Sequence, residues 1–230
     1  AEDKNEFKLL TYSADSLKRF GFESNEEMNA FRYTDFSYQK FMEAAKKEPY
    51  FKNTIFVFVG DHGIRYNGSL EYFPKSWTEQ GLTCEHVPLL FYAPALLKPQ
   101  RVHNVCSQID ILPSIASLAK IPYMNNSLGR NLFDTVAYAQ VLGHDEIIPR
   151  LPKYTAFVID HDLHTIGIVN NQYYYLKNLK TGKDDLVSSI GNNPVKESAE
   201  TDSVKNYLQQ LTDAYYETSK YLLLNNKKRK

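Results

Sequence analysis

The sequence predicts an α/β fold followed by a small antiparallel β-sheet with a helix packed on it. A helical spacing of apolar residues in the segment 25–47 leads into a short apolar run within residues 53–63. A second apolar run follows at residues 87–92. From residue 154 onward, short stretches rich in β-branched and aromatic residues alternate with polar turns, which is typical of an antiparallel meander.

The first well-marked element is a helix that we expect to begin at Asn25. Asparagine is a helix-capping residue, and Glu26 and Glu27 lie in the first turn, where the helix dipole favours acidic side chains. Pro49 ends the helix. Its apolar residues recur at helical spacing and are Phe31, Tyr38, Phe41 and Ala45. A helix that feeds a buried strand is half of a parallel crossover unit, so we expect a mainly parallel sheet.

The strand itself is predicted at residues 54–59, buried on both faces. Asp61 and His62 follow it directly, between Gly60 and Gly63. Open α/β sheets bind ligands at the carboxyl ends of their strands. A carboxylate and an imidazole on a glycine-flanked turn are able to bind one divalent cation, with imidazole favouring zinc or manganese and carboxylate favouring manganese or magnesium. The alternative is an ordinary loop in which both side chains are only solvated.

A polar segment without periodicity, residues 64–85, predicts a long loop, which is a substrate-facing lid or a structural connection. It is followed by His86 and then by the second predicted strand at residues 87–92. A single histidine before a strand is usually a loop residue. The Asp-His pair earlier in the chain makes His86 a second candidate ligand.

A further helix is predicted from about Gln108, with Pro113 in its first turn and Pro122 beyond its end. Its apolar stripe is formed by Ile111, Ile115, Leu118 and Ala119. The α/β pattern then fades near Gly143. We therefore divide the chain into an α/β domain, residues 1–145, and a small subdomain, residues 146–230.

The small subdomain is expected to contain three strands, at residues 154–159, 165–169 and 172–177, and a last helix that begins at Asp202. The apolar face of that helix is formed by Val204, Leu208, Leu211, Tyr215 and Leu222. The acidic and histidine residues of the segment 160–164 invite interpretation as a metal site. We reject it, because connections between strands are commonly polar.

Composition narrows the function classes. The 27 basic and 27 acidic residues balance, so no overall field points to nucleic acid. Cys84 and Cys106 are too few for a disulfide framework, and both a single disulfide and two thiols stay open. Neither a membrane-spanning apolar run nor a signal peptide is recognisable, so we expect a soluble chain, and the basic run at residues 227–230 reads as a solvated tail.

Four motifs of this chain occur in the same order in the sulfatase branch of the alkaline phosphatase superfamily. They are Tyr33-Thr34-Asp35, the segment from Phe51 to Gly63, the segment from His86 to Pro94, and the segment from Gln108 to Ser114. Within that branch, the chain most resembles the lipoteichoic acid synthase-like phosphoglycerol transferases.

The resemblance implies an α/β sandwich with a mainly parallel sheet, held by upstream membrane helices at the extracytoplasmic face of the membrane. In that family a threonine, held by a divalent metal, transfers a phosphoglycerol group, and the substrate here would be a lipid-linked or envelope glycan molecule. Asp61 and His62 match two metal ligands, and His86 matches a second-metal ligand or a phosphate contact. The resemblance implies manganese or zinc, with magnesium or calcium as alternatives.

The chain also departs from this pattern. In the family, the nucleophile and a glutamate ligand lie upstream of the helix-strand unit, and Thr11 and Ser13 do not supply that nucleophile. Ala14 and Asp15 stand where the family has a substrate-binding histidine. We therefore expect an incomplete catalytic domain that is inactive alone, because its nucleophile lies outside this chain. The alternatives are a fragment of a sulfatase-type hydrolase, with a cysteine or serine converted to formylglycine, and a non-catalytic envelope domain.

Overall fold

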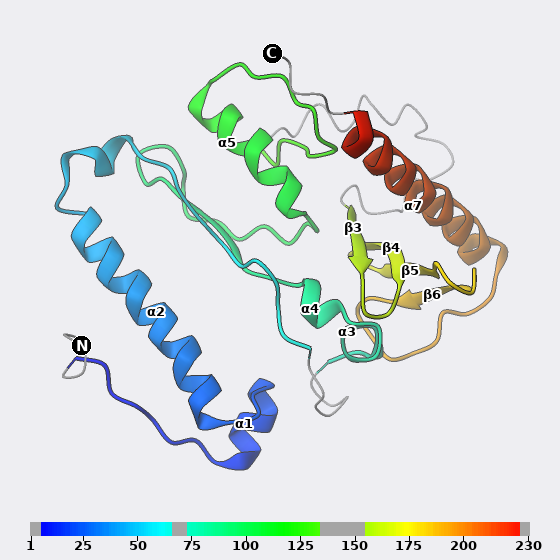
Figure 1. Ribbon diagram of the computed structural model, residues 1–230, viewed down its shortest axis with the longest axis horizontal. Coiled ribbons are helices and arrows are strands. Elements are labelled where there is room, and N and C mark those ends of the chain that lie inside the picture. Colours follow the sequence, from blue (N-terminus) through cyan, green and yellow to red (C-terminus); the bar gives the residue numbers. More distant parts are fainter. Residues whose placement is uncertain (1–5, 66–72, 134–154, 226–230) are drawn as a thin grey trace. The chain divides into compact units, whose positions relative to one another are not determined.

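The computed structural model describes residues 6–65, 73–133 and 155–225 (Figure 1). The chain divides into two compact units, residues 1–99 and 100–230. The α/β class is confirmed, because the described residues form helices together with a two-stranded and a four-stranded sheet. The domain boundary that we predicted near residue 145 lies outside the described residues.

Helix α2 is the longest element of unit 1. The elements of this unit are α1 (Ala14–Phe20), α2 (Asn25–Ala45), η2 (Pro49–Asn53), β1 (Phe56–Val59), α3 (Lys75–Thr78), α4 (Leu82–Glu85) and β2 (Leu89–Tyr92). The capping residue of α2 is Ser24, whose hydroxyl accepts a hydrogen bond from the Glu27 amide at 3.1 Å. Asn25 is instead the first helical residue, and its side-chain oxygen accepts from the Tyr12 amide at 2.6 Å. The segment before α1 is thereby tied to the start of α2.

The first sheet corrects our expectation of parallel strands. Strands β1 and β2 pair antiparallel, with Phe56 opposite Tyr92 and Val59 opposite Leu89. In the described part of the connection between them, residues 60–65 and 73–88, the helices are α3 and α4, each four residues long, and no long crossover helix is found. Burial on both faces was also wrong for this unit, because only Phe56 of β1 is buried and Val59 is 38% exposed.

Helix α2 packs on strand β1. The Tyr38 ring meets the Phe58 ring edge-on with centroids 5.2 Å apart, and Phe41 meets Phe56 with centroids 6.0 Å apart. Ala45, at the end of the helix, is 2% exposed. Aromatic contacts of this kind add to the free energy of area burial. They fix β1, and with it the point where the chain leaves the sheet.

Unit 2 is built on an antiparallel meander in the order β3-β4-β5-β6. Its elements are η3 (Gln108–Asp110), α5 (Ile111–Ala119), β3 (Thr155–Asp160), β4 (Thr165–Asn170), β5 (Tyr173–Asn178), β6 (Asp184–Ser188) and α7 (Ala199–Asn225). The three predicted strands are confirmed. The fourth, β6, was missed because it begins with two aspartates and has no apolar alternation. Its register places Asp184 opposite Lys177 and Ser188 opposite Tyr173.

The core of unit 2 lies between this sheet and α7. Its buried members are Ile168, Tyr175, Leu186 and Leu208. Helix residues Val204, Leu211 and Tyr215 pack against them, which confirms this part of the predicted apolar face. Leu222, which we had placed on the same face, is not part of this core.

A buried ion pair holds η3 and α5 in unit 2. Asp110 is 1% exposed, and its carboxylate accepts from the Ser107 amide at 2.9 Å and from the Arg130 amide at 2.7 Å. The Arg130 guanidinium lies 3.2 Å from the same carboxylate and also donates to the Thr155 carbonyl at 2.8 Å. One of the four family motifs thus has a structural role, because it links α5 to the first strand of the meander.

The structure also bears on two further expectations, which concern membrane-spanning segments and the two cysteines. Among the described helices, none is long and apolar enough to cross a membrane. Neither Cys84 nor Cys106 is in a disulfide, and both thiol residues are partly buried.

Candidate metal centre

The loop after β1 is held at both ends by close backbone contacts. The Gly60 amide donates to the Pro88 carbonyl at 3.3 Å, and the Gly63 amide donates to the Cys84 carbonyl at 2.6 Å. A Cβ atom at Gly63 would lie 2.0 Å from the Thr83 carbonyl oxygen, so no larger residue fits there without a backbone shift. The two residues between the glycines are therefore presented from a fixed turn.

Asp61 and His62 are those two residues, and their side chains lie together in solvent. The Asp61 Oδ2 atom is 3.8 Å from His62 Nε2, and the two side chains are 91% and 78% exposed. The other carboxylate oxygen, Oδ1, accepts a hydrogen bond from the His62 amide at 3.0 Å. The sequence predicted this pairing at the end of a strand, and the turn presents both groups on one side.

The hydrogen bonds of the His62 ring define which nitrogen is available. Nδ1 lies 2.8 Å from the Gly63 carbonyl oxygen, which only accepts, so Nδ1 carries the proton. Nε2 of the neutral ring then keeps its lone pair, and it is the atom that faces Asp61. A second hydrogen bond that orients a histidine in this way is the usual support of a metal-ligating imidazole.

Charge also suits a cation. The hydrogen bond from the His62 amide, with the neighbouring imidazole, holds the pKa of Asp61 below its usual value, so the carboxylate is ionised at neutral pH. The Gly63 carbonyl, with the Asp61 charge, raises the pKa of His62, so a metal ion at Nε2 would compete with a proton there. The 3.8 Å between Oδ2 and Nε2 is compatible with two donors each about 2.0–2.2 Å from one ion.

The donor types fit a divalent ion, and the pair supplies only part of a coordination shell. Within residues 6–65, 73–133 and 155–225, no group of three or more histidine, cysteine, aspartate or glutamate side chains is placed to hold a metal. Asp61 and His62 would therefore contribute two ligands to a site that needs others.

His86 lies beside this loop through its backbone. A Cβ atom at Gly63 would be 3.1 Å from the His86 carbonyl oxygen, so the two segments touch. The His86 ring packs edge-on against Trp77, with centroids 4.8 Å apart, and burial lowers the pKa of His86, although the residue as a whole is exposed. The ring is thus neutral at pH 7. Its role as a second-metal ligand or phosphate contact stays a prediction.

The contact between Trp77 and His86 was not predicted from the sequence. Trp77 lies on α3, and the Gly63 contacts come from α4, and both helices are only four residues long. Helices this short have no apolar periodicity, so the segment looked like an irregular loop. The one signal was the tryptophan itself, a large apolar residue in a polar segment.

The other histidine cluster is a turn, as we predicted. The Asp160 carboxylate accepts from the Leu163 amide at 2.8 Å and closes the connection between β3 and β4. His164 adopts a left-handed backbone conformation, with φ 54°. These features shape the turn.

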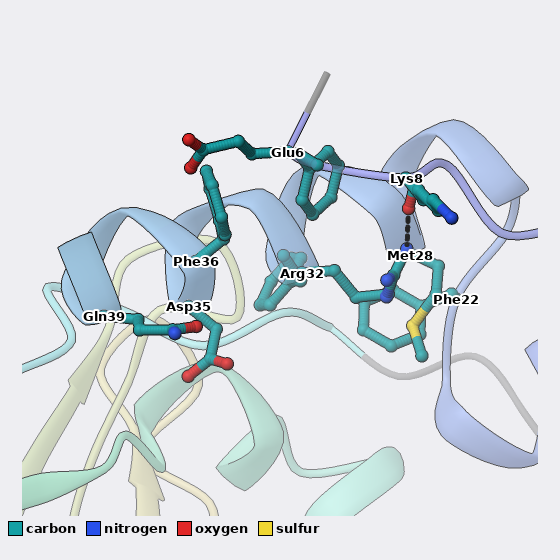
Figure 2. Close-up of a pocket in the computed structure, with 10 residues that line it drawn as sticks. Glu6, Lys8, Phe22, Met28, Arg32, Asp35, Phe36 and Gln39 are labelled. Carbon is teal, nitrogen blue, oxygen red and sulfur yellow. Dashed lines mark hydrogen bonds between the residues drawn. The ribbon is translucent and has the colours of Figure 1, made fainter. Parts of the chain in front are cut away.

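A groove of about 550 Å³ runs between α2 and the N-terminal segment of unit 1. Figure 2 shows Arg32 in this groove, where its guanidinium donates to the Lys8 carbonyl at 3.0 Å. The same guanidinium lies over the Phe7 ring, 5.1 Å from its centroid. The Arg32 guanidinium thus holds the N-terminal segment on α2. None of the candidate metal ligands Asp61, His62 and His86 lines the groove.

Comparison with known proteins shows which proteins this chain resembles in sequence. Residues 19–121 match the sequence model of the Sulfatase family. The chain is 30% identical over 148 residues to arylsulfatase K of Gallus gallus, which covers 62% of the chain and 26% of that protein. It is 28% identical over 127 residues to arylsulfatase K of Homo sapiens, which covers 53% of the chain and 23% of that protein. It is 31% identical over 87 residues to a sulfatase of Formosa agariphila, and this match covers 38% of the chain and 17% of that protein.

These matches support the sulfatase/alkaline phosphatase superfamily, and the segment that matches the family model contains the candidate loop and His86. The chain spans about a quarter of the length of the arylsulfatases that it matches. The finer resemblance to phosphoglycerol transferases stays a prediction.

Proposed function

Because residues 19–121 are sulfatase-like, we propose that this chain is the carboxyl-terminal part of a metal-dependent enzyme that cleaves a sulfate or phosphate ester. In this proposal, Asp61 and His62 supply two ligands of the metal. The observation that carries it is the glycine-anchored turn, which presents an ionised carboxylate and an imidazole lone pair 3.8 Å apart.

Each residue of the loop has a defined task in this proposal. Asp61 contributes negative charge, and His62 contributes Nε2, which the Gly63 carbonyl keeps in the required tautomer. A bound divalent ion would lower the pKa of an attacking hydroxyl group and neutralise charge on the group being transferred. We place the nucleophile and the remaining ligands in upstream sequence, so the chain alone would be inactive.

The reaction that we favour is sulfate ester hydrolysis, because the relatives reported above are named as sulfatases. A second candidate is phosphoglycerol transfer of the lipoteichoic acid synthase type, which the order of the four sequence motifs favours. That enzyme would act on a lipid-linked or envelope glycan substrate at the extracytoplasmic face of the membrane, with manganese as the metal. In both candidates the chain has the same two ligands.

The test uses the full-length protein encoded by the open reading frame, supplied with manganese, zinc, magnesium or calcium. Hydrolysis of an aryl sulfate, and release of diacylglycerol from phosphatidylglycerol as the phosphoglycerol group passes to a glycan acceptor, are measured in parallel. We expect sulfate hydrolysis, and a loss of about 100-fold or more in kcat for Asp61→Asn and for His62→Gln, since even partners that only orient a ligand are worth 10–100-fold.

A matched control is available in the β3–β4 turn. Asp162→Asn and His161→Gln make the same chemical changes at exposed residues outside the candidate loop, and they should leave kcat unchanged. Full activity in the Asp61 and His62 variants would reject the metal assignment. Diacylglycerol release without sulfate hydrolysis would select the second candidate. No turnover of either substrate with any of the metals would favour a non-catalytic domain.

A further inference from the structure

The last turns of helix α7 carry apolar side chains in solvent. Tyr221, Leu223 and Leu224 are 64%, 82% and 78% exposed. The same helix buries Leu208 completely against the sheet of unit 2, and its last residue packed against the core of that unit is Tyr215. The helix therefore continues for more than two turns beyond the core that stabilises it, with leucines where a solvated helix end would have polar residues.

Basic residues follow this apolar cluster directly. Lys227, Lys228, Arg229 and Lys230 are consecutive in the sequence. From residue 214 onward the single acidic residue of the sequence is Glu217, and it is paired with Lys220 at 3.0 Å. The segment thus combines exposed leucine and tyrosine side chains with an excess of positive charge.

We propose that the carboxyl-terminal end of α7 binds an anionic lipid surface. Apolar side chains that enter the boundary between headgroups and acyl chains, together with lysine and arginine that attract anionic headgroups, are the two components of interfacial helix binding. Tyrosine favours the same boundary. The apolar stretch is too short to cross a bilayer, so the contact is with the surface.

Charge argues for lipid over a second copy of the chain. Packing two copies through this end would bring two runs of four basic residues together, which is repulsive. An anionic membrane removes that repulsion and covers the leucines at the same time. The inference does not rest on the proposed enzymatic function, because it uses no residue of the candidate loop.

The experiment is sedimentation of the 230-residue chain with vesicles. One set contains phosphatidylcholine alone, and the other contains equal amounts of phosphatidylcholine and phosphatidylglycerol. We expect binding to the anionic vesicles only, and weaker binding at high salt, because salt screens charges that lie near the surface. Replacing Leu223 and Leu224 by glutamine should weaken the partition coefficient at least about tenfold. Replacing the basic residues by glutamine should weaken it about fivefold for each charge.

The control is a second pair of exposed apolar residues. Leu9 and Ile190 are 76% and 72% exposed, so Leu9→Gln with Ile190→Gln removes a similar amount of exposed apolar surface elsewhere. This variant should bind as the parent chain does, and circular dichroism should show equal helix content in all variants. Absence of binding to anionic vesicles, or equal loss in the control, would overturn the proposal. So would a dimer, measured by light scattering, that the Leu223 and Leu224 changes dissociate while no vesicle binding is seen.

Discussion

Asp61 in unit 1 and Asp110 in unit 2 both lie in the segment that matches the Sulfatase family model, yet their surroundings are opposite. Asp110 is 1% exposed, and its carboxylate is filled by two backbone amides and the Arg130 guanidinium. The Asp61 side chain is 91% exposed and lies 3.8 Å from an imidazole nitrogen whose lone pair is available. A buried carboxylate whose oxygens accept hydrogen bonds from the protein stabilises the fold. An exposed carboxylate beside an imidazole nitrogen is able to bind a metal ion.

The difference teaches that a shared motif does not by itself mark chemistry. In the segment from Gln108 to Ser114 the acidic residue, Asp110, binds the Arg130 amide and guanidinium, and Arg130 in turn donates to the Thr155 carbonyl of β3. In the segment that ends at Gly63 the acidic residue, Asp61, lies at the surface on a turn with a glycine at each end. We therefore expect changes at Asp110 to act on stability, and changes at Asp61 to act on binding.

The largest effect should come from Asp110→Ala. This change removes the buried carboxylate that the Arg130 guanidinium, 17% exposed, contacts at 3.2 Å, so we expect the free energy of unfolding to fall by about 3–5 kcal/mol. Urea unfolding followed by circular dichroism measures it. Asp61→Ala is the matched control and should stay within about 0.5 kcal/mol of the parent. Equal losses of stability in the two variants would contradict a stabilising role for Asp110 that Asp61 lacks.

A smaller effect is expected where the backbone closes around Asp110. A Cβ atom at Gly129 would lie 1.9 Å from the Ile109 carbonyl oxygen, so Gly129→Ala must push the two segments apart and should cost about 1–3 kcal/mol. At Gly191 the nearest atom to a Cβ is 4.0 Å away, so Gly191→Ala should change the free energy of unfolding by less than about 0.5 kcal/mol. Urea unfolding compares the two variants. An unchanged free energy of unfolding in Gly129→Ala would show that the contact between Gly129 and Ile109 is not tightly packed.

The candidate loop should show its effect in metal binding instead. We expect calorimetry to detect weak binding of manganese or zinc by the 230-residue chain, because two protein ligands leave most coordination positions to water. The double variant Asp61→Ala, His62→Ala should weaken this binding at least about tenfold. The control variant His161→Ala, Asp162→Ala should bind as the parent does. Tight binding that survives the loss of Asp61 and His62 would place the metal elsewhere.

The smallest effect tests a partly exposed carboxylate, intermediate between the two extremes. The Lys205 ammonium, 2.7 Å away, and the Tyr175 hydroxyl, 3.0 Å away, lower the pKa of Asp184. A lowered folded-state pKa gives stability that is present above the unfolded value near 4 and is lost as the pH falls through the folded value.

Asp184→Asn should therefore lower the free energy of unfolding at pH 7 by about 0.5–1 kcal/mol, a range that allows for screening by solvent. The difference from the parent should shrink as the pH falls below about 4. Urea unfolding at a series of pH values measures this. A difference that grows toward acid pH would contradict the assignment of Lys205 as the main partner.

The amino-acid sequence determined what depends on neighbours along the chain. The helix after Ser24, the apolar strand, the glycine-flanked Asp61-His62 turn and the three strands of the meander were all predicted, because spacing, capping residues and turn residues act over a few positions. The Asn170 side chain, which accepts from the Gln172 and Tyr173 amides at 2.8 and 2.7 Å, illustrates such local control.

Only the tertiary structure decided which distant segments meet. An apolar run has the same pattern in a parallel and an antiparallel pair, so the sequence did not reveal that β1 and β2 run antiparallel. The Asp110–Arg130 pair joins residues 20 positions apart, and Trp77 covers His86 from a four-residue helix. Contacts of this kind leave no periodic pattern in the sequence. The path of the chain in space determines which residue each side chain meets, and the neighbouring residues in the sequence do not.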